Sequence, residues 1–227
     1  MCIKAVIIME IPRSSGFQLR HMMCEFGQLS RPDGDVTVFQ GDTSVTTAVY
    51  GPGEVRMNKE ILNKATVETV FKPKSGLPGC AEKMFERTLR NTCETFLLAA
   101  LHPRSSISII VQEIQDSGSF LSCCVNSCCL ALLDASVAMK FLVAAVTCAI
   151  DSEECIILDP TVKQEKDSCA VLTFVFENKD DSILAVYTTG SYTVQQFQQC
   201  SQTCGEASKA VFDFYRTSIE KKLSKAT

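Results

Sequence analysis

The stretch from Asp116 to Ala135, DSGSFLSCCVNSCCLALLDA, decides how the rest of the chain is arranged. Its first four residues form a turn, and the turn leads into a helix predicted over Phe120–Ala135. Apolar residues and cysteines occur nearly all round this helix, which therefore has no face suited to water. We expect a helix that is buried near the centre of the protein and covered by other elements.

This helix also carries a cluster of cysteines with the spacing CCxxxCC. The cluster consists of Cys123, Cys124, Cys128 and Cys129. Zinc sites usually join two cysteine pairs across a longer loop, whereas one helix cannot wrap four ligands tetrahedrally around an ion. Free cysteine behaves as a small buried apolar residue. We therefore expect these thiols to pack in the core, with no metal site and no other cofactor.

Outward from this helix, the chain alternates between strand-like and helix-like segments. Strands are predicted at 17–24, 36–39, 44–50, 54–57, 65–72, 107–114, 139–150, 155–158, 171–176 and 183–187, and further helices at 81–101 and 194–223. This order predicts an α/β (α+β) fold of two βα-type halves in a single compact domain, residues 17–227, that ends in a long helix. Residues 1–16 are predicted to be a loose N-terminal leader, because Pro12–Gly16 does not suit a packed element.

Composition and charge exclude several classes of protein. Apolar residues make up 46% of the chain and charged residues 21%, which excludes a disordered or fibrous protein. The net charge is −4, so any contact with nucleic acid must come from a local patch or a partner. No stretch approaches the ~20 apolar residues that a membrane helix needs. We expect a soluble, intracellular protein whose cysteines are reduced.

Basic residues gather around the helix predicted at 81–101. The group comprises Lys72, Lys74, Lys83, Arg87, Arg90 and, after the helix, Arg104. Spacings of four and three place Lys83, Arg87 and Arg90 on one helical face, which suits contacts with the phosphates of single-stranded RNA. The alternative is a solvated face whose cations pair with neighbouring glutamates. Spacing alone leaves both interpretations open.

Several short stretches are more specific in combination than any one of them alone. They are LSRPDG at 29–34, QGDTSV at 40–45, YGP at 50–52, ERTLR at 86–90, DSG at 116–118, ALLDA at 131–135 and LDPT at 158–161. In this order they resemble the RNase PH family, from about Leu19 to the C-terminal helix, and within it the ring subunits of the eukaryotic RNA exosome. The resemblance implies an RNase PH-like β-α-β-α fold, of the kind called ribosomal protein S5 domain 2-like.

The resemblance also implies partners and a cellular role. Six RNase PH-like ring subunits, as three heterodimers, would form a hexameric ring under cap subunits, and single-stranded RNA would thread its channel. The work of such a ring is 3′-to-5′ processing and degradation of RNA, including ribosomal RNA maturation and the decay of messenger and non-coding RNA. The implied location is nucleus and nucleolus, and also cytoplasm, with no membrane partner.

The resemblance further implies that catalysis has been lost. Active members cleave RNA by phosphorolysis and place Asp-Gly-Gly-Thr-Arg before the buried helix, where the Arg clamps phosphate. The matching positions here run from Ser117 through Gly118 and Ser119 to Leu121, and an apolar side chain cannot clamp an anion. Active members also carry two Asp about six residues apart, which align with Glu165 and Val171. We therefore expect no phosphorolysis from this degenerate site.

Other roles remain open at this point. In the family, the helix with Arg87 and Arg90 faces the channel region, so Lys83, Arg87, Arg90 and Arg104 are candidates for contact with RNA or a neighbouring subunit. A residual phosphorolytic nuclease, or a metal-dependent hydrolytic 3′ nuclease using Glu165, Asp159 and Asp167, is one alternative. A free homodimer that binds nucleic acid is another.

Overall fold

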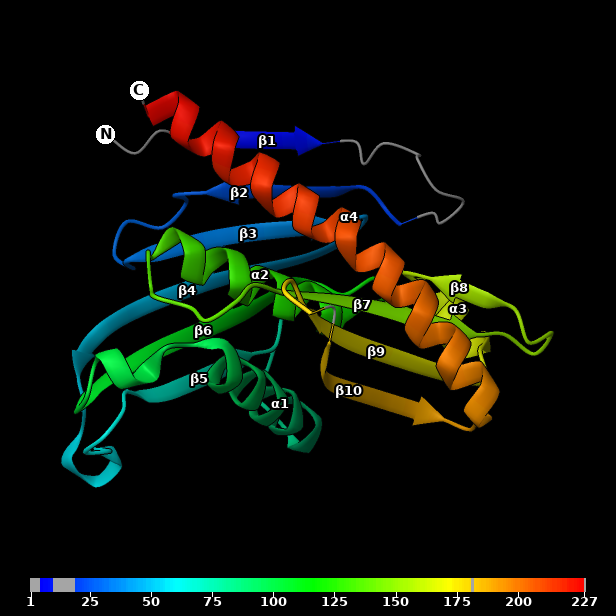
Figure 1. Cartoon of the computed structure of the whole chain (residues 1–227), viewed down its shortest axis with the longest axis horizontal. Coiled ribbons are helices and arrows are strands. Elements are labelled where there is room, and N and C mark those ends of the chain that lie inside the picture. The colour runs from blue at the N-terminus through cyan, green and yellow to red at the C-terminus, as the bar shows by residue number, and fades with distance from the viewer. Residues whose placement is uncertain (1–4, 10–18, 181, 227) are drawn as a thin grey trace.

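In the computed structural model, which describes residues 5–9, 19–180 and 182–226, two β-sheets enclose one central helix (Figure 1). The first sheet has six strands in the order β1-β2-β3-β4-β6-β5. These strands are β1 (Ala5–Met9), β2 (Met22–Phe26), β3 (Gly34–Gln40), β4 (Thr43–Glu54), β5 (Thr66–Lys72) and β6 (Ser105–Gln115). Only β5 and β6 pair in parallel; the other neighbours are antiparallel.

The second sheet has four antiparallel strands in the order β10-β9-β7-β8. Its strands are β7 (Val143–Ile150), β8 (Ile156–Leu158), β9 (Ala170–Glu177) and β10 (Ile183–Gly190). Every residue of β7 is buried, because helices cover this strand on both faces. The predicted mixed α/β architecture with two halves is confirmed.

Four α-helices complete the fold of the described residues. They are α1 (Cys80–Phe96), α2 (Phe120–Asp134), α3 (Val162–Asp167) and α4 (Val194–Ala226), and short 3₁₀ helices lie at Met57–Lys59 and Ala99–Leu101. The long α4 crosses the second sheet and reaches β1 at the edge of the first (Figure 1). Within the described residues, no helix is both long and apolar enough to cross a membrane.

The central helix is α2, which packs on β3 and β4 of one sheet and on β7 and β9 of the other. All its residues from Leu121 to Leu132 are buried, as its apolar composition predicts. The amide of Asn126 donates to Ala145 O at 3.0 Å and accepts from Ala145 N at 2.8 Å. The Tyr215 hydroxyl of α4 also donates to Asn126 Oδ1 at 2.8 Å. Since each buried polar atom of Asn126 is paired, α2, β7 and α4 are held in one fixed arrangement.

The amphipathic helix α1 connects the two parallel strands of the first sheet. Parallel strands need such a crossover because a tight turn cannot join them. Its buried face includes Leu89, Cys93 and Phe96, while Lys83 and Arg87 are exposed, as the periodicity predicts. The helix presses its apolar face on β5 and leaves its basic face to solvent.

Two elements are four or five residues shorter at one end than predicted, and both differences have one cause. The helix predicted to reach residue 101 ends at Phe96, and the strand predicted from residue 139 begins at Val143. Leu98 N donates to Ala138 O at 3.1 Å, and Lys140 N donates to Phe96 O at 2.8 Å. The backbone groups that follow α1 thus pair with those that precede β7. They are not available to extend the helix beyond Phe96 or to begin the strand before Val143.

The predicted leader and two other short segments also need correction. The leader was expected to be loose, but Ala5–Met9 forms β1 and pairs with β2; the remainder, 1–4 and 10–16, lies outside the described residues, and the boundary after residue 16 stays a prediction. Of the strand predicted at 54–57, only Glu54 is in a strand, as the last residue of β4. The strand predicted at 17–24 begins at Met22 as β2; residues 19–21 are not in a strand, and 17–18 lie outside the described residues. Helix α3 was missed, although Thr161 and Gln164 form a capping box at its start.

The LSRPDG and ALLDA stretches, far apart in sequence, meet at the C-terminal end of α2. Asp35 N donates to Asp134 Oδ2 at 3.0 Å, and Asp134 also pairs with Lys222 of α4. Gly34 packs so closely here that a Cβ would lie 2.3 Å from Ala135 N. A glycine is therefore required at this position by the approach of the helix and not by its own backbone angles.

We predict that Gly34→Ala lowers the free energy of unfolding by about 3 kcal/mol, the upper part of the range for overpacked interiors. The methyl group would collide with backbone atoms of α2, which cannot move aside without disturbing the core. Urea denaturation of the purified chain measures the change. Gly53→Ala is the matched control, because a Cβ there meets nothing within 4 Å. Equal stability of the two variants would contradict the packing argument.

Candidate functional site

The junction between β6 and α2 is the point where the two halves of the protein meet. Gly118 has a φ of +102°, and a Cβ on it would lie 2.4 Å from Pro160 O. Ser119 follows in the left-handed region with a φ of 52°, and its hydroxyl donates to Pro160 O at 3.1 Å. The loop before α2 is therefore pressed against the segment between β8 and α3, and its conformation is set by this contact.

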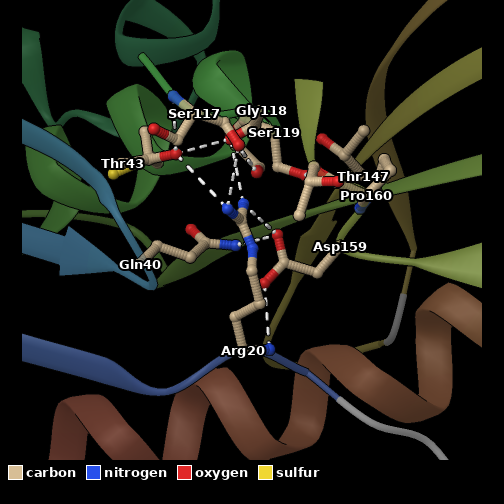
Figure 2. A network of polar contacts seen from close by, with 12 residues as sticks. Arg20, Gln40, Thr43, Ser117, Gly118, Ser119, Thr147, Asp159 and Pro160 are labelled. Carbon is tan, nitrogen blue, oxygen red and sulfur yellow. Dashed lines mark hydrogen bonds and ion pairs between the residues drawn. The ribbon is translucent and has the colours of Figure 1, made fainter. Parts of the chain in front are cut away.

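A buried ion pair joins this junction to the start of β2. Arg20 Nη2 lies 2.7 Å from Asp159 Oδ1, and the Arg20 backbone N–H donates to Asp159 Oδ2 at 3.0 Å (Figure 2). Gln40 Nε2 donates to the same Oδ1 at 2.9 Å. The Asp159 side chain is only 1% exposed, so its charge depends on these partners.

The same arginine also holds the loop before α2. Its guanidinium donates to Ser117 O at 3.2 Å and to Gly118 O at 2.9 Å (Figure 2). Thr43 Oγ1 donates to Gly118 O at 2.7 Å and lies 3.2 Å from Ser117 N, which donates to it. With a fourth bond from Arg20 Nη1 to Thr43 Oγ1 at 3.5 Å, protein oxygens accept four hydrogen bonds from this guanidinium, which is a structural clamp and not a free anion-binding group.

Glu165 of α3 reaches the N-terminal end of α2. Its Oε1 accepts a hydrogen bond from Ser119 N at 2.7 Å. Burial raises the pKa of Glu165 above its ordinary value, and the hydrogen bond from Ser119 partly offsets this effect. A carboxylate thereby occupies a helix N-terminus, the kind of place where a phosphate would otherwise bind.

Leu121 and Val171, the two other positions expected from the family resemblance to belong to a degenerate site, are apolar and contribute no charge. Leu121 is 7% exposed and belongs to the hydrophobic core on the first turn of α2. Val171 lies on β9, opposite Ala149 of β7 and Thr189 of β10. The structure thus brings Gly118, Ser119 and Glu165 together, while Leu121 packs in the core and Val171 is half-buried on β9.

The described residues offer no support for a metal centre. Within them, no group of three His, Cys, Asp or Glu side chains could hold an ion. The cysteines of α2 are buried as expected, and burial raises the pKa of Cys129 to about 12. Of the carboxylates considered for hydrolysis, Asp159 is held by Arg20 and Glu165 caps α2, whereas Asp167 is exposed.

The four candidate cations around α1, Lys83, Arg87, Arg90 and Arg104, are exposed, but three of them already have an acidic partner. Lys83 Nζ lies 3.0 Å from Glu86 Oε1, Arg90 Nε 3.8 Å from Glu94 Oε1, and Arg104 Nε 3.6 Å from Glu60 Oε1. Arg87 has no ion pair to any described residue. Paired cations are partly neutralised, so Arg87 is the candidate of these four with the most charge available to a ligand.

Sequence reasoning missed the residues that organise the junction, above all Arg20, Gln40 and Thr43. A signal for two of them was present, because Gln40 and Thr43 flank the turn of the QGDTSV stretch. Their partners lie 74 or more positions further along the chain. Only the folded arrangement reveals that these side chains converge on one loop.

Comparison with known proteins places these features in a family. The patterns of the 3′ exoribonuclease family match residues 18–138 for its domain 1 and residues 142–203 for its domain 2. The "Exosome complex exonuclease RRP46 homolog" of Arabidopsis thaliana is 33% identical over 96% of this chain and 100% of its own length. The "Exosome complex component RRP46" of Saccharomyces cerevisiae is 32% identical over 69% of this chain and 74% of its own length.

Solved structures agree with this assignment. The crystal structure of rice (Oryza sativa) Rrp46 superposes with a TM-score of 0.86 at 32% identity, covering 93% of this chain and 100% of that one. A chain of the Archaeoglobus fulgidus exosome with RNA bound to the active site gives a TM-score of 0.74 at 16% identity, over 87% and 89% of the two chains. The second likeness shows a shared fold alone.

We predict that Arg20→Met lowers the free energy of unfolding by about 3 kcal/mol, because it leaves the buried Asp159 carboxylate without its charge partner. Two carbonyl oxygens of the loop before α2 would also lose their donor. Chemical denaturation measures the effect. Arg90→Met is the control, since its ion pair with Glu94 is exposed and is expected to contribute less than about 1 kcal/mol. If both variants lost the same stability, the clamp role of Arg20 would be wrong.

Proposed function

Because the chain belongs to the 3′ exoribonuclease family of RNase PH, we propose that it is a structural subunit of an RNA exosome ring, which supports 3′-to-5′ RNA processing and degradation without cleaving RNA itself. Its relatives carry the names of exosome components or exonucleases, and the chain spans the full length of the Arabidopsis relative. The other RNase PH-like ring subunits and the cap subunits are its proposed partners.

The observation that carries the non-catalytic role is the chemistry at the start of α2. Phosphorolysis requires donors that hold an inorganic phosphate beside the phosphodiester, where two like charges must be neutralised together. At this position the chain offers the buried apolar side chain of Leu121 and the carboxylate of Glu165, which already accepts the Ser119 N–H. A phosphate placed there would face a negative charge and would have no arginine to bind it.

The nearby cation cannot compensate for the missing arginine. Arg20 directs its guanidinium to Asp159 and to the carbonyl oxygens of Ser117 and Gly118. To bind phosphate it would have to leave a carboxylate that is nearly fully buried, at a cost of several kcal/mol. This arrangement favours a rigid junction between the two halves, a property that suits a ring subunit.

The cellular role follows from the exosome assignment. We propose that the ring with this subunit acts in ribosomal RNA maturation and in the decay of messenger and non-coding RNA. The proposed locations are the nucleus, the nucleolus and the cytoplasm. Within the ring, Lys83, Arg87, Arg90 and Arg104 are proposed to contact RNA or an adjacent subunit, with Arg87 the strongest candidate because it has no intrachain ion pair to a described residue.

We predict that the purified chain releases no nucleoside diphosphates from single-stranded RNA in the presence of inorganic phosphate. Loss of the anion clamp should place its rate at least ~100-fold below that of an active family phosphorolase assayed in parallel. Thin-layer chromatography of end-labelled RNA detects the products. Phosphate-dependent release of diphosphates would show that the site is catalytic, and cleavage that needs a divalent metal but no phosphate would identify a hydrolase.

We also predict that the chain, co-expressed with RNase PH-like exosome ring subunits, elutes with them as one complex of six ring subunits. Size-exclusion chromatography with multi-angle light scattering measures the mass of the complex, and mass spectrometry identifies its subunits. The Arg20→Met variant should assemble less well, since its two halves are less firmly joined. A chain that stays monomeric or forms only homodimers beside assembled partners would contradict the ring role.

A further inference from the structure

A groove with a basic lining lies away from the β6–α2 junction, between β5, the following loop and the start of α1. Its volume is about 450 Å³, which falls within the usual range for small-ligand sites and is sufficient for a nucleotide. Three lysines are among its lining residues, namely Lys72, Lys74 and Lys83. Ser75 and Gln112 add polar groups, and no carboxylate is among the lining residues.

Hydrogen bonds to β6 fix the wall of this groove. Gln112 Nε2 donates to Pro73 O at 3.2 Å, and Lys74 N donates to Glu113 Oε2 at 3.3 Å. These contacts hold the loop after β5 against the next strand. The lysines on this wall are therefore carried by an anchored backbone, which lowers the entropy lost when a ligand binds.

The carboxylates around the groove are directed at backbone N–H groups. Glu86 Oε2 accepts from Phe71 N at 3.2 Å and Glu82 Oε2 from Gly79 N at 2.8 Å, while Glu113 accepts from Lys74 N. Of the three lysines, only Lys83 forms an ion pair with a described residue, namely Glu86. Lys72 and Lys74 thus keep charges that no described carboxylate neutralises.

Apolar surface lies beside these charges. Val70, 38% exposed, and two prolines, Pro73 and Pro78, line the same groove. A phosphate needs cations, whereas a sugar or a base gains from apolar contact, and single-stranded nucleic acid presents both at each residue. Inorganic phosphate would use only the charged part of this lining.

We propose that this groove binds one or two nucleotides of single-stranded RNA, with Lys72 and Lys74 contacting phosphates and the proline-lined wall contacting the sugar or base. The proposal rests on the proposed function, because the groove would be a binding site for the RNA that passes a ring subunit. The proposal distinguishes primary from secondary RNA contacts among the cations near α1 by whether a carboxylate already forms an ion pair with each of them. Arg90 and Arg104, which are paired, are secondary contacts.

The test uses fluorescence anisotropy of a labelled ten-nucleotide oligoadenylate, titrated with the full-length chain at several salt concentrations. Lys72→Glu with Lys74→Glu should weaken binding at least tenfold at low salt, and the salt slope should fall by about 1.4, or ~0.7 for each lost phosphate contact. Lys72→Gln with Lys74→Gln should give a smaller loss in the same direction. Circular dichroism confirms that each variant is folded.

Two control variants separate a specific groove from general electrostatics. Arg216→Glu with Lys163→Glu, and Lys166→Glu with Lys179→Glu, each make the same two changes of sign at exposed positions outside the groove and outside α1. The proposal requires the groove variant to lose clearly more affinity for the oligonucleotide than either control. Equal losses in all three, or no loss in the groove variant, would overturn it.

Assembly with ring subunits distinguishes this proposal from the proposed function. If the wild-type chain does not enter a ring but loses RNA affinity on substitution of Lys72 and Lys74, the groove stands and the ring role falls. If the wild-type chain assembles and the groove variant is excluded from the ring, the groove is a subunit contact and the RNA proposal is wrong. If the wild-type chain and the groove variant both assemble, and only the variant binds RNA more weakly, the result supports the ring role and the RNA-binding groove.

Discussion

The burial of α2 between two sheets is the constraint on which the rest of the structure depends. Residues Leu121–Leu132 are all removed from water, so neither half of the chain can be stable without the other to cover this helix. Asn126 shows how strict the arrangement is, because its amide pairs with both backbone groups of Ala145 and with Tyr215. A shift of either sheet would leave these buried polar atoms unpaired, which costs more than most single contacts contribute.

This constraint also positions the site. Since α2 is fixed at both sheets, its N-terminal end lies close to the start of β2, the turn between β3 and β4, the end of β6 and α3. Arg20, Thr43 and Glu165 each contact the loop at 117–119 there. The helix end could hold an anion, but a side chain of the protein supplies one. Close to this end of α2, the ion pair between Asp159 and Arg20 connects the two halves of the chain.

Much of the fold was predictable from sequence because strong local patterns governed it. The apolar circumference of α2, the amphipathic α1 and the β3–β4 hairpin around Gln40–Thr43 were all predicted correctly. The errors occurred where backbone groups find distant partners. Phe96 ends α1 because Lys140 N binds its carbonyl, and Ala5–Met9 becomes a strand because β2 offers a free edge. Such long-range pairing leaves no periodic signal in the segment itself.

By itself, the sequence determined the family resemblance, the buried helix and the presence of Leu121, and not a cation, on the first turn of that helix, since these depend on which residue type stands at a position. Tertiary structure alone decided how the remaining charges are used. It paired Arg20 with Asp159, turned Glu165 toward Ser119, and neutralised Lys83 and Arg90 while leaving Arg87, Lys72 and Lys74 without ion pairs to described residues. The reason is physical: the electrostatic role of a charge depends on its distance from other charges and on its burial, and both are fixed only when the chain folds.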